Sequence, residues 1–438
     1  MLGYYLKLAW LSIKRNPILS ALMVTAIALG IGASMTTLTV NYMMSNNPIP
    51  SKSDQLYYVQ LDNWDPNDPF DEPNEPPDQV TFRDALNLLH ANKAERQVAM
   101  AKTNFIVEPD NQEVKPFHAR GRLTSKDFFP MFSVPFLYGQ GWNQAADDNG
   151  DLVVVITKAL NEKLFNGENS VGQSLRMQGE QYRIVGVMDT WEPTPHFYDV
   201  TNGAFGEQED VYVPFILKRD LELPNSGNTN CWKTPEGDGF KAFLQSECVN
   251  YQFWAELPDN NAKDNYMSFL NSYVMEQKKL GRFPRPLNNR LSDVMEWMKK
   301  QGVVADDAKM MMYMSFMFLL VCLLNTIGLL LTKFVGKAGE IALRRAVGAS
   351  RTQLYWQHLV ETGLIGFAGG IFGLLLAWAG LAGVRHLYGD NLKPDLATLD
   401  MKLVLIGIAL AVVSSMLAGL YPTWRACRIP PAGQLKTQ

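Results

Sequence analysis

Residues 333–351 read KFVGKAGEIALRRAVGASR, a short, basic, helix-forming stretch that lies between two long apolar runs. Cationic side chains close to the ends of membrane segments stay on the cytoplasmic side. The stretch therefore predicts a cytoplasmic loop. A soluble partner is expected to dock on it.

Two apolar runs precede this stretch and two follow it. Each is long enough to cross a hydrocarbon core of about 30 Å as a helix. They cover residues 18–44, 310–332, 359–383 and 403–421. The first run continues well beyond the apolar core of a signal peptide, which is roughly 7 to 15 residues long. We therefore expect an uncleaved anchor and a multi-pass membrane protein.

Charge sets the expected orientation of these four crossings. The N-terminal flank carries Lys7, Lys14 and Arg15 without an acidic residue, and the C-terminal tail is likewise basic. Both termini are therefore predicted to be cytoplasmic. The segments between the crossings are then assigned as a cytoplasmic N-terminal segment at 1–17, a periplasmic domain at 45–309, a cytoplasmic coupling segment at 333–358, a short periplasmic loop at 384–402 and a cytoplasmic tail at 422–438. The N-terminal segment fits either an amphipathic surface helix or an extension of the first crossing.

The large outer segment alternates short β-rich runs with helical patterns, which predicts a mixed α and β domain of one or two subdomains. Helices are expected over about 80–93, 157–165, 261–279 and 289–312. The pattern also allows the last of these helices to continue without a break into the second crossing. The segment is rich in acidic residues, as in DNWDPNDPFDEPNEPPD at 62–78. Acidic composition does not suggest a nucleic-acid partner, and none is expected.

Cysteine and histidine placement bears on covalent links and metals. Cys231 and Cys248 both lie in the outer segment, so a disulfide is plausible in an oxidising compartment. Two unpaired thiols remain the alternative, because spacing cannot show that their Cβ atoms meet. No cysteine and histidine cluster has the spacing of a metal site. No nucleophile has a recognisable adjacent base, and no catalytic residue is assigned.

The coupling segment has a defined helical pattern. A helix over 340–349 places Ile341, Arg344, Arg345 and Gly348 on one side, as an apolar and cationic ridge that fits a groove on a partner. Glu340 can pair with Arg344 one turn later. The alternative is an ordinary basic loop that satisfies the topology rule.

Small residues mark the third crossing. Gly366, Gly369, Gly370 and Gly373 form two overlapping small-xxx-small spacings, which allow helices to approach closely in lipid. Packing within one four-helix bundle is favoured over a subunit interface. Glu361 lies near the expected start of the same crossing, so an interfacial position is expected for it.

Several separated blocks resemble one family. These are ARGRLTSKDFFPMFSVPFLYGQGW at 119–142, VVVITKALNEKLFNGENSVGQSLRMQGEQYRIVGVM at 153–188, GEIALRRAVGASRTQLYWQHLVETGLIGFAGGIFG at 339–373 and GLYPTWRACRIPPAGQL at 419–435. The chain is similar, end to end, to permeases of the MacB type, in the FtsX, LolC and LolE superfamily of ATP-binding-cassette (ABC) proteins. The paired Arg344 and Arg345 favour the MacB branch over the lipoprotein-releasing branch.

The resemblance implies a fold of four transmembrane helices plus a large extracytoplasmic α+β domain like the MacB periplasmic core. It also implies a transporter permease that is not itself an enzyme. The chain has no GxxxxGK[ST] phosphate loop, so ATP and Mg are expected on a partner ABC ATPase subunit and no cofactor on this chain. The residues expected to couple to the ATPase are Glu340, Ile341, Leu343, Arg344, Arg345, Gly348, Ala349 and Arg351.

The resemblance further implies a place in the bacterial inner membrane and several partners. They are a second permease copy, identical or related, a periplasmic membrane-fusion adaptor and an outer-membrane channel. The implied mechanism is mechanotransmission, in which ATP hydrolysis moves the periplasmic domain to export a substrate such as an antimicrobial compound or peptide. The alternative is an FtsX-like regulatory protein that controls a cell-wall hydrolase or senses a peptide. A passive receptor would leave the basic motif unexplained.

Overall fold

The computed structural model describes the chain except for residues 1, 73, 110–114, 304–305, 389–400 and 428–438. It divides into two compact units. The helical unit comprises residues 1–45 and 304–438, and the α/β unit comprises residues 46–303. Most of the loop expected at 384–402 and of the tail expected at 422–438, including the end of the GLYPTWRACRIPPAGQL block, lies outside the described residues.

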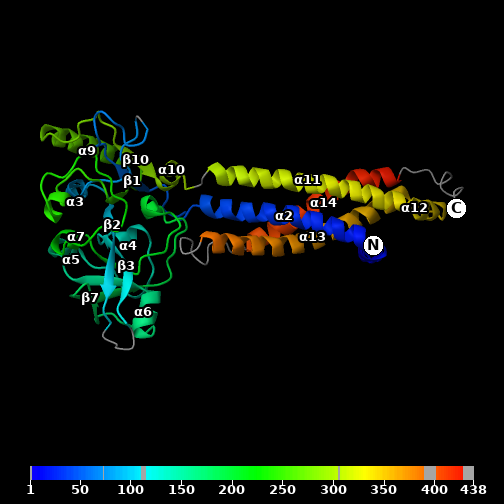
Figure 1. The fold of residues 1–438 in the computed structure, drawn as a ribbon, viewed down its shortest axis with the longest axis horizontal. Coiled ribbons are helices and arrows are strands. Elements are labelled where there is room, and N and C mark those ends of the chain that lie inside the picture. The colour runs from blue at the N-terminus through cyan, green and yellow to red at the C-terminus, as the bar shows by residue number, and fades with distance from the viewer. Residues whose placement is uncertain (1, 73, 110–114, 304–305, 389–400, 428–438) are drawn as a thin grey trace. The chain divides into compact units, whose positions relative to one another are not determined.

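The helical unit is built from long apolar helices that lie alongside one another (Figure 1). Its helices are α1 (Leu2–Arg15), α2 (Pro17–Ser45), α11 (Asp306–Gly336), α12 (Ala338–Ala346), α13 (Arg351–Tyr388) and α14 (Met401–Cys427). Within the described residues, four helices are long and apolar enough to cross a membrane: α2, α11, α13 and α14. Together with the α/β unit they give the fold class predicted from the sequence.

The first two helices are separate elements. α1 ends at Arg15, and Pro17 opens α2, where its fixed backbone angle suits the first helical position. α1 packs against α13 and exposes Tyr4, Trp10 and Leu11. The N-terminal segment is therefore a distinct amphipathic helix and not an extension of α2.

The α/β unit contains one mixed sheet whose described strands number ten. The strands are β1 (Leu56–Gln60), β2 (Arg96–Val107), β3 (Phe117–Thr124), β4 (Phe136–Gly139), β5 (Val153–Thr157), β6 (Ser174–Met177), β7 (Glu180–Met188), β8 (Val211–Pro214), β9 (Gln252–Glu256) and β10 (Arg290–Asp293). Their order is β10-β1-β9-β2-β3-β8-β5-β7-β4, and β6 pairs with both β2 and β7. The β3–β8 and β5–β7 pairs are parallel and the others antiparallel.

Alternating side chains of the central strands enter two cores, one on each face of the sheet. In β1, for example, Tyr57 and Val59 join one core, whereas Leu56 and Tyr58 join the other. The first core includes α3 (Phe82–Ala91), α6 (Lys158–Phe165) and α9 (Asn260–Lys279), and the second includes α4 (Phe128–Met131), the 3-10 helix η1 (Phe197–Asn202) and α10 (Val294–Lys300). The sequence left open whether this region has one or two subdomains. Because one continuous sheet separates the two cores, the region is a single unit. The remaining helices are α5 (Gln144–Asn149), α7 (Leu217–Asp220) and α8 (Phe240–Leu244).

Three expected helices of this unit are present with side-chain caps. Thr81, Thr157 and Asp259 each accept a hydrogen bond from the backbone at the start of α3, α6 and α9. The fourth expectation, a helix over 289–312, was wrong. The stretch forms β10, then α10, which opens with a capping box at Asp293 and is followed by Gly302 at φ +60°. The predicted helix is thus interrupted before α11.

A buried ion cluster in the second core was not anticipated. Arg122 on β3 is fully buried and donates to the carboxylates of Asp199 and Glu209. Burial opposes ionisation of Glu209, but the Arg122 guanidinium offsets this effect and lowers the pKa of Glu209 to about 2. The cluster fixes η1 and the start of β8 against β3.

Candidate coupling site

The coupling segment forms the short helix α12 between α11 and α13. Gly348, at φ +104°, ends it in a conformation that only glycine adopts without strain. Ser350 then starts α13: its hydroxyl accepts from the amide of Gln353 at 3.2 Å, and the Gln353 side chain accepts from the amide of Ser350 at 3.0 Å. Gly348 and Ser350 therefore separate α12 from α13.

The orientation of α12 differs from the expected ridge. Ile341 is 4% exposed and belongs to the core of the helical unit, so its assignment to an accessible ridge was wrong. The large apolar side chains exposed on α12 and its C-cap are Leu343, at 57%, and Val347, at 83%. Helical periodicity identifies residues that share a face, but it does not tell which face the bundle covers. The accessible surface is an apolar edge.

Polar contacts tie α12 to its neighbours. Arg344 donates to Glu340 at 2.6 Å and to Gln357 of α13 at 2.9 Å. Glu340 also receives Arg15 of α1 at 3.4 Å. Of the other predicted coupling residues, Arg345 and Ala349 are half-buried, and Gly348 and Arg351 are exposed. The cationic residues therefore hold α12 in place as well as flank its exposed edge.

A buried charge cluster lies beside α12 and centres on Glu361 of α13. Glu361 is fully buried, with Lys333 at 2.7 Å, Lys337 at 3.6 Å and His358 at 3.4 Å. Glu361 lies within α13, which begins at Arg351, and other helices enclose its side chain; the interfacial depth expected for it stays a prediction. Lys333 and Lys337, one helical turn apart where α11 ends, were the available sequence signal for a carboxylate partner.

Hydroxyl groups extend this cluster to the first two helices. Ser12 of α1 donates to Glu361 and accepts from Lys337, and Ser20 of α2 accepts from Lys333 at 3.1 Å. One carboxylate thereby connects four helices of the bundle with the start of α12. A buried ion pair of this kind is retained only when its hydrogen-bonding capacity is satisfied. The cluster therefore joins the start of α12 to the long helices through charged contacts.

The four predicted packing glycines all contact other helices of the same chain. A Cβ on Gly366 would lie 1.9 Å from Ser415 Oγ, and one on Gly370 would lie 2.9 Å from the Ala411 Cβ, both on α14. A Cβ on Gly369 or Gly373 would lie 2.7 to 2.8 Å from Ile27 or Ile31 of α2. The two spacings thus bring α13 close to α14 on one side and to α2 on the other.

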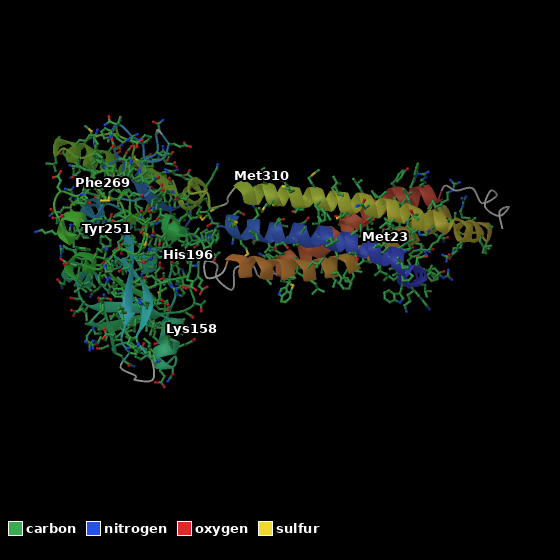
Figure 2. The ribbon with its side chains drawn as sticks, viewed as in Figure 1. Met23, Lys158, His196, Tyr251, Phe269 and Met310 are labelled. Carbon is green, nitrogen blue, oxygen red and sulfur yellow. A yellow bond between two sulfur atoms is a disulfide. The ribbon has the colours of Figure 1, made fainter. Side chains whose placement is uncertain are left out.

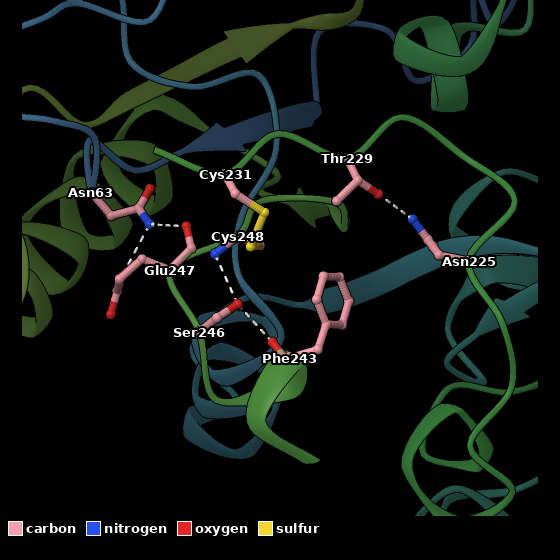
Figure 3. Close-up of a disulfide and its surroundings, with 8 residues drawn as sticks. All are labelled: Asn63, Asn225, Thr229, Cys231, Phe243, Ser246, Glu247 and Cys248. Carbon is pink, nitrogen blue, oxygen red and sulfur yellow. Dashed lines mark hydrogen bonds between the residues drawn. A yellow bond between two sulfur atoms is a disulfide. The ribbon is translucent and has the colours of Figure 1, made fainter. Parts of the chain in front are cut away.

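The structure joins Cys231 and Cys248 in a disulfide within the α/β unit (Figure 3). Cys322 and Cys427 are buried free thiols. In the part of the chain that the structure describes, no group of three or more histidine, cysteine or carboxylate side chains is placed to hold a metal ion.

Comparison with known proteins gives matches along most of the chain. Residues 20–257 match the family model of the MacB-like periplasmic core domain, and residues 312–431 match that of the FtsX-like permease C-terminal region. The macrolide export ATP-binding/permease protein MacB of Syntrophobacter fumaroxidans is 23% identical over 72% of this chain and 46% of its own length. The pyoverdine export ATP-binding/permease protein PvdT of Pseudomonas syringae is 22% identical over 71% and 42%.

The chain spans about half the length of these curated relatives. By contrast, an ABC transporter permease of Bacillus subtilis, YknZ, is 19% identical over 98% of both chains. Among solved structures, the periplasmic region of MacB from Actinobacillus actinomycetemcomitans aligns with a TM-score of 0.37 and 13% identity, over 59% of this chain and 96% of that region.

Proposed function

The chain belongs to the MacB/FtsX family of ABC transporter permeases, and from this premise we propose that it is a permease subunit driven by a separate ATPase subunit. The near end-to-end match to YknZ, which is named as a permease alone, supports a separate ATPase. ATP and Mg would bind that ATPase. The permease would lie in the bacterial inner membrane, with both termini in the cytoplasm.

The observation that carries the proposal is the exposed edge of α12. Leu343 on α12 and Val347 at its C-cap are exposed, and Arg344 braces this short helix against α13. An exposed apolar pair flanked by arginines suits a groove on a soluble partner, because exposed apolar surface rimmed by polar residues marks sites of protein–protein interaction. In our proposal the ATPase grips this edge.

The contacts of the helical unit support mechanotransmission as the mechanism we propose. Movement of α12 would pass through the Lys333, Lys337 and Glu361 cluster to α11 and α13. The close glycine contacts would carry it from α13 to α2. Since α2 and α11 are the helices next to the α/β unit along the chain, movement of these two helices would act on the α/β unit.

A second permease copy is supported by α11. This helix is the least enclosed of the four long helices, and it exposes a methionine-rich and aromatic face at its start, with Met310 62% exposed, whereas Met23 of α2 is fully buried (Figure 2). Asn325 is also exposed on α11. A side-chain amide facing lipid is unfavourable without a partner, so a related helix against this face is the arrangement we propose.

We propose export of a periplasmic substrate as the biological role, with an adaptor and an outer-membrane channel as further partners. The names of the MacB and PvdT relatives refer to macrolide and pyoverdine export, which supports a small antimicrobial compound or peptide as substrate class. FtsX-like control of a cell-wall hydrolase or of peptide sensing is the competing role. The proteins that copurify with the chain distinguish the two.

Val347→Glu is the variant that tests the docking edge. A charge at this 83% exposed position should disrupt an apolar contact, and we expect about tenfold less ATPase to copurify from native membranes in mild detergent. Mass spectrometry identifies the ATPase and any adaptor, hydrolase or sensor kinase. The control is Tyr4→Glu, which adds the same charge at an uncharged residue of α1 that is 63% exposed. If the parent chain recovers no ATPase, or if Val347→Glu recovers as much as the control, the proposal is wrong.

A further inference from the structure

The α/β unit contains a polar cavity of about 450 Å³ next to the Cys231–Cys248 disulfide. Three segments enclose it: the loop after Cys231, the end of α8 with the residues that follow, and the turn at 280–284. Arg83 of α3 completes the wall. Because Trp232 and Glu247 are the chain neighbours of the two cysteines, the disulfide holds two of these segments together (Figure 3).

Glu247 organises the cavity wall through a set of charge-assisted hydrogen bonds. It accepts from Arg83 Nη2 at 2.6 Å, from Arg282 Nε at 2.6 Å and from Asn63 Nδ2 at 3.1 Å. Arg282 also donates twice to Asp84, at 2.8 and 2.7 Å, which fixes its guanidinium in a bidentate arrangement. The wall is therefore rigid before any ligand arrives.

Two donors on the cavity wall have no acceptor. The indole Nε1 of Trp232 and the Nε of Arg83 are buried and make no hydrogen bond. Among the cavity-lining residues, all of which the structure describes, no buried acceptor atom is left without a partner. Unpaired buried donors are costly and rare in folded proteins. Unpaired donors without unpaired acceptors indicate a ligand that supplies hydrogen-bond acceptor atoms.

The charges of the lining residues indicate which charge the ligand carries. The lining holds three cationic side chains, Arg83, Lys233 and Arg282, against the two carboxylates of Glu236 and Glu247. Lys233 already pairs with Glu236, and Asp84 lies behind Arg282, whereas Arg83 keeps a buried donor without an acceptor. A single negative charge suits this site, whereas a doubly charged phosphate would be repelled by the nearby carboxylates.

We propose that this cavity binds a small carboxylate-bearing ligand of about tripeptide size, with the carboxylate on Arg83 and Trp232. The volume lies within the range of small-molecule sites, about 300 to 1,000 Å³. Phe283 and the prolines of the lining supply apolar contact for the rest of the ligand. The assignment concerns the α/β unit alone and does not depend on the ATPase.

The test is a titration of the purified full chain with two probes, N-acetyl-Ala-Ala-Ala carrying a free C-terminal carboxylate and the same peptide as the C-terminal amide. Saturation-transfer NMR without nucleotide measures binding. The acid should bind about tenfold more tightly than the amide, because only the acid can form a charge-assisted pair with Arg83. Arg83→Gln should reduce the affinity for the acid to that for the amide. The matched control is Lys241→Gln, because Lys241 is an exposed residue of α8 outside the lining. This variant should leave the affinity for the acid unchanged.

Trp232→Phe keeps an aromatic ring but removes the N–H donor, and it should weaken acid binding severalfold. It decides the outcome if Arg83→Gln does not fold, since Arg83 also bonds Glu247. Two results overturn the proposal: equal affinity of the parent chain for the acid and the amide, or full affinity for the acid in every variant that folds. Because no ATP is present, this result is separate from the copurification that tests the transporter role.

Discussion

At the residue scale, Glu361 shows what the sequence could not predict. Its presence in an apolar run was visible, and His358 lies one turn before it on the same helix, but its partners Ser12, Lys333 and Lys337 come from other segments of the chain. Sequence spacing relates residues on one helix and cannot show which helices meet. The same limit explains why Ile341 was assigned to an accessible ridge and lies instead in the core.

The Glu361 cluster predicts an asymmetric mutational response. Glu361→Gln leaves Lys333 buried without its counter-charge and should lower the free energy of unfolding by about 3 to 5 kcal/mol. The double variant Glu361→Leu with Lys333→Met removes both charges and should recover much of that loss. Thermal unfolding in detergent measures both. Glu340→Gln, whose side chain is 37% exposed, is the control and should cost no more than about 0.5 kcal/mol. Equal losses in Glu361→Gln and Glu340→Gln would contradict the assignment.

Asp147 gives the α/β unit a pH dependence. Its carboxylate accepts from the Lys126 amide at 2.7 Å and from Trp142 Nε1 at 2.6 Å, yet burial raises its pKa to about 6. Between the ordinary carboxyl pKa and 6 the folded state binds more protons than the unfolded state, so this residue makes stability rise as pH falls from 7 to 5. The midpoint of thermal unfolding should rise more over that range in the parent than in Asp147→Asn. Parallel pH profiles would refute the shift.

At the element scale, α13 is the helix around which the others pack. The small-xxx-small spacing predicted close approach, and the structure supplies the partners: α14 against Gly366 and Gly370, α2 against Gly369 and Gly373. Which helix meets which glycine could not be predicted, because the pattern specifies a smooth face and not its neighbour. The break before α11 was missed for a related reason, since helical periodicity continues across a cap and a glycine turn.

Gly366→Ala tests the close contact with α14. The added Cβ would meet Ser415 Oγ at 1.9 Å and the Ala411 carbonyl oxygen at 2.8 Å, so α13 and α14 must separate. Overpacking of this kind costs about 1 to 3 kcal/mol, which should appear as a lower midpoint of thermal unfolding. Gly363→Ala is the control on the same helix, because its Cβ would come no closer than 3.6 Å to Met416. A variant as stable as this control would argue against close packing at Gly366.

At the scale of the whole molecule, the sequence predicted the class of fold well and its topology poorly. Four apolar runs and a strand-rich insertion were enough to give four long helices and an α/β unit. The strand order was out of reach, because β1 pairs with β9 and β10, which are contributed by residues at the far end of the insertion. Pairings of such long sequence separation leave no local pattern in the strands themselves.

The central claim is that ATP binding and hydrolysis on a partner move the α/β unit through α12. The most direct measurement places spin labels at Leu280 of the α/β unit and Met310 of α11, both exposed, in the chain reconstituted with its ATPase. The distance between the labels should change when ATP and vanadate trap the ATPase, and the change should disappear in Val347→Glu. An unchanged distance with the ATPase bound and trapped would contradict the claim.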